Sequence, residues 1–452
     1  LSEIVTGDGI LIDLTAPSTG LVFDGNESDE FGEYQFSGSD SIITGSWTSF
    51  EDFTSGISGY EVAVNEGNVY PWTWVGNVPS KRISGLTLDH GVTYTYSVRA
   101  TDSAGNVSDE ASSDGIYVDL EGPNSQVNID ALFFNQISWD SYPRLKGTAS
   151  DGEGESGVYS VEVLVYDSTG NYYYNGTGWQ QEELWLTVSG TESWEYDLPY
   201  ENLTDGHGYL VQSRAKDLVD NMQTDFGEDG FIYDASDPTT TLDISEDYYN
   251  YTSLSNHSHI VGTAFDNVSG ISIVEVAVVD NSDNGTYLNE DQSWQQEEYW
   301  FRANGQDSWD FFLDPALLTN GHEYIVYARA TDVSGNLELS HSSDTFTFDS
   351  GPPISHVQIE REYYNSSNWS DANTVSGISL DTVSGINMIQ VSILRTSDNY
   401  WFEGASNQWA LDTNWLEPSG LEDWSYPLNN NTLVNGVSYI IYSRAQDNAG
   451  NF

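Results

Sequence analysis

The sequence predicts an all-β chain of four tandem β-sandwich domains, joined end to end in a linear rod. The first observation is an internal repeat: "VRATDSAGN" recurs as "SRAKDLVDN", "ARATDVSGN" and "SRAQDNAGN". The second is the alternation of apolar and polar residues in "VYSVEVLVYD" and "ISIVEVAVVD", which is the period of a strand. The third is the Asp, Asn and Gly turn signal after such segments, spaced as in sandwiches of about 100 residues.

Composition limits the class of protein. The 452 residues are 38% hydrophobic and 13% aromatic, which is too apolar for a disordered chain despite the net charge of -59. No segment approaches the roughly 20 apolar residues of a membrane helix, and cysteine is absent, which excludes disulfides and thiol chemistry. With 71 acidic against 12 basic residues, the surface should repel nucleic acid and attract divalent cations.

Single residues and a short phrase recur at a constant spacing in the repeats. The repeated arginines lie 115 residues apart, at Arg99, Arg214, Arg329 and Arg444. The phrase Leu-x-x-Gly-x-x-Tyr keeps the same step and ends at Tyr94, Tyr209, Tyr324 and Tyr439. This phrase predicts a tyrosine corner, in which the hydroxyl bonds to nearby backbone.

Tryptophans repeat at the same step in the last three repeats, at Trp179/Trp294/Trp409, Trp185/Trp300/Trp415 and Trp194/Trp309/Trp424. The third set is expected in the core. The first two flank a polar loop, and they are either core residues or platforms on which sugar rings stack. The repeated arginines are expected to lie across this aromatic surface, in reach of cation–π contact.

The repeats divide the chain into residues 1–13, 14–119, 120–234, 235–349 and 350–452. In residues 14–119, "SWTSFEDFTSGISGYEVAV" and "ISGLTLDHGVTYTYSVRATDSAGN" resemble a fibronectin type III domain. The later repeats, with "GTASDGEGESGVYSVEVLV" and "RAKDLVDN", resemble Ig-like repeats of large bacterial and archaeal surface proteins. The resemblance implies a spacer, an adhesive arm or an envelope component.

The opening residues 1–13 align with the last strand of the first full repeat, whereas the repeat at 350–452 lacks that strand. Two hypotheses explain why the sequence has an extra strand at residues 1–13 and lacks one in the repeat at 350–452. Either the segment is a slice of a longer tandem array, or residues 1–13 complete the last repeat of another copy by strand donation. Donation is a head-to-tail contact and builds an open filament.

Aspartates recur where the repeats meet. In a sandwich of this connectivity the last strand of one repeat and two loops of the next reach the same end, so three aspartates are expected together. Calcium prefers six to eight oxygen ligands, and three carboxylates with loop carbonyls would supply them. The alternative is that each aspartate only caps its own turn. The predicted metal ligands are Asp13/Asp52/Asp102, Asp119/Asp151/Asp217, Asp234/Asp266/Asp332 and Asp349/Asp381/Asp447.

The sequence contains no catalytic motif: no phosphate-binding loop, zinc-spaced Cys/His set or serine elbow is present. We therefore expect no enzymatic activity and no catalytic residues. Glycosylation sequons occur in predicted turns, as in a secreted glycoprotein. They lie at Asn26, Asn106, Asn175, Asn202, Asn250, Asn256, Asn267, Asn284, Asn365, Asn368 and Asn430.

The expected function is structural and extracellular: a repeat subunit or segment of a surface filament, stalk or envelope layer, stiffened by calcium. Its expected partners are copies of itself or further repeats of the same chain, without nucleic acid or membrane insertion. Two alternatives stay open. One is an adhesin arm that binds surface glycans through aromatic loops, and the other is an accessory module of a secreted polysaccharide-active enzyme.

Overall fold

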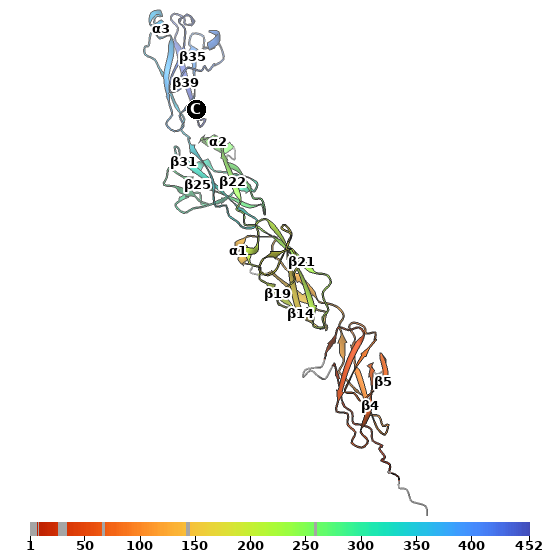
Figure 1. The fold of residues 1–452 in the computed structure, drawn as a ribbon. Coiled ribbons are helices and arrows are strands. Elements are labelled where there is room, and N and C mark those ends of the chain that lie inside the picture. The colour runs from red at the N-terminus through yellow and green to blue at the C-terminus, as the bar shows by residue number, and fades with distance from the viewer. Residues whose placement is uncertain (1–6, 8, 26–33, 66–67, 142–144, 257–259) are drawn as a thin grey trace, which may run out of the picture. The chain divides into compact units, whose positions relative to one another are not determined.

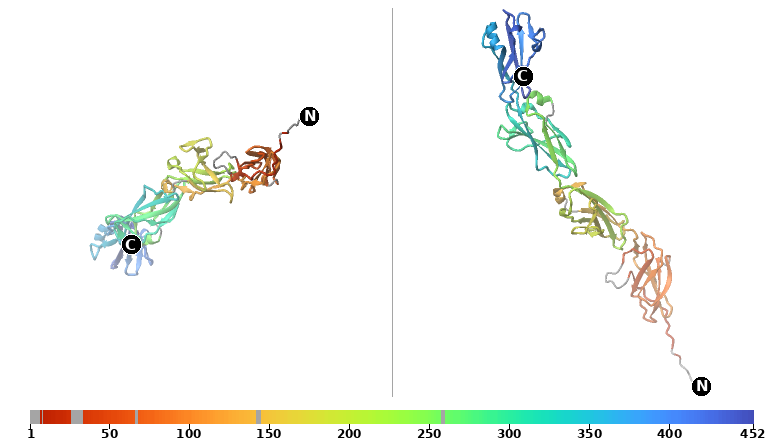
Figure 2. Two further views of the ribbon diagram at one scale, coloured as in Figure 1. Left: turned by 90° about the horizontal axis from the view of Figure 1, so that it is seen from below. Right: turned by 45° about the horizontal axis from the view of Figure 1, so that its top comes forward.

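Each repeat folds into β-sheets packed around its own apolar core, so the all-β sandwich prediction is confirmed (Figure 1). The computed structural model describes the chain except residues 1–6, 8, 26–33, 66–67, 142–144 and 257–259. The chain divides into two units, residues 1–234 and 235–452, and each unit holds two repeats. Figure 2 shows the same sheets from two further directions.

The first repeat has one sheet in the order β1-β3-β6, a second in the order β5-β4-β8-β9, and a short ladder β2-β10-β7. Its core gathers Trp47, Val62 and Tyr96, all buried. The strands are β1 (Leu21–Asp24), β2 (Phe36–Ser37), β3 (Ile42–Thr48), β4 (Ile57–Val64), β5 (Tyr70–Gly76), β6 (Ser80–Ser84), β7 (Thr93–Tyr94), β8 (Tyr96–Asp102), β9 (Ala111–Ser112) and β10 (Ile116–Val118).

The second repeat pairs β11-β13-β19-β18 in one sheet and β12-β21-β20-β14-β15-β16 in the other, with β17 beside β14. This is the strand order of Ig-like sandwiches. The elements are β11 (Asn124–Val127), β12 (Phe133–Phe134), α1 (Gln136–Ser141), β13 (Leu145–Ser150), β14 (Val158–Asp167), β15 (Tyr172–Tyr174), β16 (Trp179–Gln180), β17 (Leu186–Thr187), β18 (Ser189–Gly190), β19 (Ser193–Tyr196), β20 (His207–Asp217) and β21 (Gly227–Tyr233).

The third repeat has the same two sheets, β22-β24-β30-β29 and β23-β32-β31-β25-β26-β27, with β28 beside β25. Its elements are β22 (Thr239–Ile244), β23 (Tyr248–Tyr249), α2 (Tyr251–Asn256), β24 (Ile260–Phe265), β25 (Ile271–Asp280), β26 (Thr286–Leu288), β27 (Trp294–Gln295), β28 (Phe301–Arg302), β29 (Asn304–Gly305), β30 (Ser308–Phe311), β31 (Glu323–Asp332) and β32 (Ser342–Phe348).

The fourth repeat has sheets β33-β34-β38 and β37-β36-β35-β39. Among the described residues, β39 pairs with β35 alone, whereas its counterpart β31 pairs with strands on both sides. The elements are β33 (Ile354–Gln358), α3 (Ser366–Ala372), β34 (Thr374–Leu380), β35 (Ile386–Arg395), β36 (Tyr400–Phe402), β37 (Trp409–Ala410), β38 (Asp423–Pro427) and β39 (Tyr439–Asp447).

The third tryptophan set lies in the core, as expected. Trp194 pairs across the ladder with Gly147, and a side chain on that glycine would collide with the indole ring. The next repeats use the same pair, Trp309 over Gly262 and Trp424 over Gly377. The glycine therefore makes room for a buried tryptophan in each of the last three repeats.

The tyrosine corners are confirmed in all four repeats. The hydroxyl of Tyr209 accepts a hydrogen bond from the backbone N–H of Thr204 at 2.7 Å. Tyr94, Tyr324 and Tyr439 accept the equivalent bonds from Asp89, Thr319 and Val434 at 2.7–2.9 Å. Each bond pins the turn before the long central strand.

The short helices were not expected. In α1, the side chain of Asn135 accepts from the N–H of Ser138, and Trp139 is buried beneath the helix. Asn250 and Asn365 cap α2 and α3 in the same way. The Asn caps carry the missed signal, because Asn is a preferred N-cap residue. None of the helices in the described part of the chain is long and apolar enough to cross a membrane.

Candidate metal centres at the repeat joints

Three predicted aspartates converge where the first repeat of unit 1 meets the second. Asp119 follows β10, Asp151 follows β13 and Asp217 ends β20. Each offers a carboxylate oxygen, and these oxygens lie within 4.8 Å of one another. Asp119 and Asp217 are almost fully buried, at 0% and 1% exposed.

Two further sets converge within a unit in the same way. Asp13, Asp52 and Asp102 form the set at the start of unit 1, and Asp349, Asp381 and Asp447 form the set inside unit 2. For the remaining predicted set, Asp234 ends unit 1, while Asp266 and Asp332 lie in unit 2.

Local hydrogen bonds orient the aspartates in the loops. The Oδ1 of Asp381 accepts from the N–H groups of Val383, Ser384 and Gly385, at 2.8–2.9 Å. Asp52 and Asp266 cap their own loops in the same manner. The two interpretations of the aspartates are therefore compatible: each one caps its turn, and the capped turns bring the carboxylates together.

An asparagine that sequence reasoning missed joins the linker to the loop. The Nδ2 of Asn221 donates to Oδ2 of Asp217 at 2.8 Å and to the carbonyls of Asp119 and Glu121 at 3.0 and 3.2 Å. Asn106 and Asn451 make the equivalent bonds. The signal was present in the sequence, since this Asn closes the repeated phrase "VRATDSAGN".

Crowded negative charge marks the buried sets. Burial, a hydrogen bond with Glu155 and the charge of Asp119 raise the pKa of Asp151 to about 6. Burial also raises the pKa of Asp217 and Asp447, and neighbouring carboxylates add to the effect. At Asp13, hydrogen bonds from Ser55 and Thr15 instead lower the pKa.

The residues present suit a hard divalent cation. Oδ2 of Asp13 and Oδ1 of Asp151 are buried and accept no hydrogen bond, which is costly for a carboxylate unless a cation or proton compensates. A cation would gain these oxygens together with those of the other two aspartates in each set. An all-oxygen, carboxylate-rich donor set is the preference of calcium. The sets therefore fit calcium on chemical grounds.

The predicted cation–π contacts are confirmed. The guanidinium carbon of Arg214 lies 4.2 Å from the ring centre of Trp185, and that of Arg329 lies 4.0 Å from Trp300. Arg99 over Trp72 and Arg444 over Trp415 make the same stack. A sugar ring would have to displace the arginine from that face. This arrangement weighs against Trp185 and its repeats as glycan platforms.

The sequons differ in accessibility. The side-chain amide of Asn106 is engaged at the joint, and Asn250 is 7% exposed and caps α2. A glycan on Nδ2 of Asn106 would have to break bonds at the joint, and the burial of Asn250 leaves little room for a glycan there. Asn26 lies outside the described residues. The other sequons stay predictions, at Asn175, Asn202, Asn256, Asn267, Asn284, Asn365, Asn368 and Asn430.

No protein-family model and no curated protein matches the chain. Among solved structures, the tetra-tandem repeat from the extending region of a large adhesion protein is 17% identical, covering 96% of this chain and 97% of that one, with a TM-score of 0.33. The chain is similar to adhesin repeats.

Two bacterial ice-binding adhesins are similar as well. One is a Ca2+-stabilised adhesin of an Antarctic bacterium, 15% identical over 96% of this chain and 99% of that one, with a TM-score of 0.30. The other is a 1.5-MDa adhesin, 14% identical over 69% and 91%, with a TM-score of 0.33. The Ig-like and fibronectin-like fold follows from the strand order of the sheets.

Proposed function

We propose that this chain is a non-enzymatic repeat segment of an extracellular surface protein, and that calcium at the joints holds successive repeats in a fixed orientation. The observation that carries the proposal is the buried aspartate set Asp119/Asp151/Asp217, whose members come from two repeats. Calcium would supply the positive charge that these carboxylates lack. The high acidic content agrees with a protein that works in a cation-rich exterior.

Residues of the chain itself already connect the first and second repeats at this joint. Asp119 belongs to the linker, Asp151 and Asp217 belong to the second repeat, and Asn221 already ties the linker to the loop. A cation shared by the three carboxylates would add a second tie between the same parts. Because calcium binds the folded joint and not the unfolded chain, it should raise the melting temperature by binding linkage.

The test measures melting and small-angle scattering of the whole chain in calcium and in chelator. We expect calcium to raise the melting temperature and to narrow the distribution of molecular dimensions. Asp151→Asn should remove the part of the calcium response that the Asp119/Asp151/Asp217 set contributes in unit 1, and Asp381→Asn the part that the Asp349/Asp381/Asp447 set contributes in unit 2. The matched control is Asp114→Asn, at an exposed aspartate outside the sets. Identical curves with and without calcium would refute the proposal.

We also propose that the open edge of β39 takes a further strand. Ile440 and Tyr442 on this strand are 44% and 42% exposed, and an unpaired edge invites strand addition. Ile10 and Ile12 are also exposed and share one face of an alternating segment. The occupant is either a further repeat of the same chain or residues 1–13 of another copy.

Adding a peptide of residues 1–13 to a chain that lacks them distinguishes between these two occupants. A synthetic peptide of residues 1–13 should stabilise the fourth repeat of a chain that lacks those residues, if strands are donated. A peptide with Ile10 and Ile12 replaced by Asp is the control. If neither peptide changes melting or oligomeric state, strand donation by residues 1–13 is wrong.

A further inference from the structure

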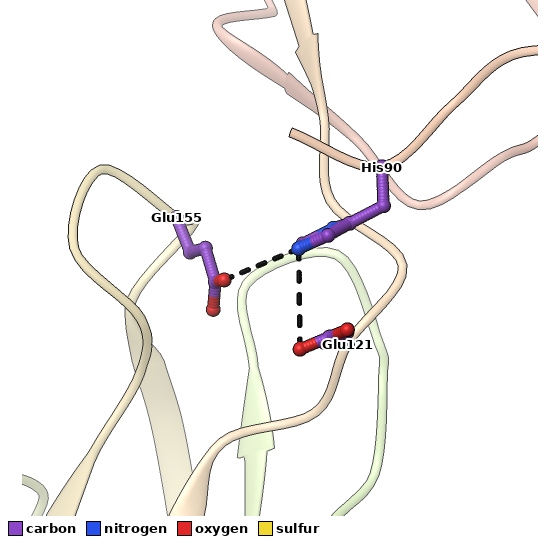
Figure 3. A group of neighbouring side chains, drawn as sticks. All are labelled: His90, Glu121 and Glu155. Atoms are coloured by element: carbon purple, nitrogen blue, oxygen red, sulfur yellow. Dashed lines mark ion pairs between the residues drawn. The ribbon is translucent and has the colours of Figure 1, made fainter. Parts of the chain in front are cut away.

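We propose that the joint between the first and second repeats carries a second metal site, which binds a transition-metal dication of the zinc class. The site is formed by His90, Glu121 and Glu155. Figure 3 shows the three side chains approaching one another from three different segments. His90 precedes β7, Glu121 lies in the linker, and Glu155 lies in the loop between β13 and β14. Their ligand atoms lie within 4.8 Å of one another.

Glu155 reaches the site because its loop is longer than the others. The loop from Asp151 to Gly157 has two more residues than the equivalent loops, Asp52 to Gly56, Asp266 to Gly270 and Asp381 to Gly385. Glu155 lies within the enlarged loop, and its Oε2 accepts the N–H of Gly152 at 2.7 Å. Its other oxygen, Oε1, faces Nε2 of His90 at 3.4 Å. The side chain is 13% exposed.

His90 occupies a position that is an asparagine in unit 2. There, Oδ1 of Asn320 accepts the linker N–H groups of Ser350 and Gly351 at 2.7 and 3.1 Å. His90 keeps this role through Nδ1, which accepts the N–H of Leu120 at 3.1 Å. The asparagine suffices for the linker, so the imidazole adds something further: a second nitrogen, Nε2, directed at two carboxylates.

The surroundings of the ring suit a metal ligand. When Nε2 binds a metal, the ring proton moves to Nδ1, which then needs an acceptor. The buried Oδ1 of Asp119 lies 3.8 Å from Nδ1, so a small rotation of the ring exchanges the bond from Leu120 for one to Asp119. A carboxylate behind a coordinated histidine is the usual arrangement in zinc sites.

Distances and ligand type select the metal. Tetrahedral zinc with bonds of about 2.0 Å places its ligand atoms about 3.3 Å apart, close to the 3.4 Å between Nε2 of His90 and Oε1 of Glu155. Oε2 of Glu121 is 4.0 Å from Nε2, on a side chain that is 72% exposed and free to adjust. Imidazole favours zinc-class ions, whereas calcium prefers oxygen ligands alone.

The inference goes beyond the calcium proposal and does not depend on it. The test uses the whole chain, stripped of metal and then saturated with calcium, and measures zinc by equilibrium dialysis and Co2+ by its visible absorption. Three variants are compared. His90→Asn introduces the asparagine found at the equivalent position 320, and Glu155→Gln removes the charge of the loop carboxylate. Asn320→His places an imidazole in unit 2 beside a loop without a glutamate.

We expect the unmodified chain to bind one more zinc equivalent than His90→Asn, and Glu155→Gln to bind that equivalent at least about tenfold more weakly. Asn320→His should gain none. Melting in calcium reports whether the variants fold and whether calcium acts at the aspartates. Equal zinc binding in the unmodified chain and His90→Asn overturns the site, as does displacement of the zinc by excess calcium.

Discussion

The side-chain amide of Asn221 donates a hydrogen bond to the backbone carbonyl of Asp119, 3.0 Å away and 102 residues earlier in the chain. The same amide bonds to the carbonyl of Glu121 and to Oδ2 of Asp217. One nitrogen thus connects the linker between two repeats to a loop of the second. The joint is held by direct bonds, and the aspartates around them are positioned by the same structure.

Replacing this asparagine should loosen the joint. Asn221→Ala leaves the nearly buried Asp217 without one of its donors, and an unsatisfied buried acceptor costs about 1–3 kcal/mol. We expect lower stability of unit 1 in denaturant and faster proteolysis between residues 119 and 123. Asn451→Ala is the matched change in unit 2, where the same three bonds occur. Unchanged proteolysis in Asn221→Ala would contradict a clamp role.

Without calcium, unit 1 should gain stability as the pH falls from 7 to 5. The pKa of Asp151 is about 6 in the folded protein, against an ordinary value of 3.8. Between these values the folded state binds more protons than the unfolded state, so the free energy of unfolding rises as the pH falls and is lost as the pH rises through 6. Calorimetry in chelator at several pH values measures this trend.

Asp151→Asn is the control for that trend, because it removes the titrating carboxyl of Asp151 and should reduce the dependence between pH 5 and 7. Saturating calcium should flatten or reverse it as well, since protons then compete with the cation. A chelated protein whose stability does not rise from pH 7 to 5 would contradict a raised pKa of Asp151.

Loss of a tyrosine corner should destabilise one repeat. Tyr209→Phe removes the acceptor of the Thr204 N–H while keeping the buried ring, at a cost of about 1 kcal/mol. Tyr324→Phe removes the equivalent bond in unit 2. Denaturant unfolding followed by hydrogen exchange assigns the loss to a unit. A loss that spreads equally through both units would argue against independent repeats.

The arginine stacks should respond differently to salt. Arg329 bonds to the carboxylate of Glu275, whereas Arg444 bonds to the neutral side chain of Gln390. Replacing either arginine by Gln removes the positive charge and the stack on tryptophan, at a cost of up to about 1 kcal/mol. High salt should reduce the effect of Arg329→Gln more than that of Arg444→Gln, because only Arg329 loses an ion pair. Urea unfolding at two salt concentrations compares them, and equal salt dependence would be inconsistent with the ion pair.

Local sequence determined the fold class and much of the joint. The alternation in "VYSVEVLVYD" requires a strand with one buried face, and the Asp of each repeated phrase predicts a capped turn, because both depend on neighbours within a few residues. The Tyr209 corner belongs to the same class, with its partner Thr204 five residues away. Repetition at a constant step added the aspartate sets, since strand connectivity is shared by all repeats.

Tertiary structure decided what depends on distant contacts. The residues next to Asn221 in the sequence do not indicate that its amide bonds to the carbonyl of Asp119. The residues next to His90 likewise do not indicate that Oε1 of Glu155, 65 residues later, lies 3.4 Å from Nε2 of the histidine. These contacts depend on how two sandwiches are joined and on the loop from Asp151 to Gly157, which is two residues longer than the equivalent loops of the other repeats. Periodicity records which face of a strand is buried, but only the packed chain determines which side chains share a joint and what charge gathers there.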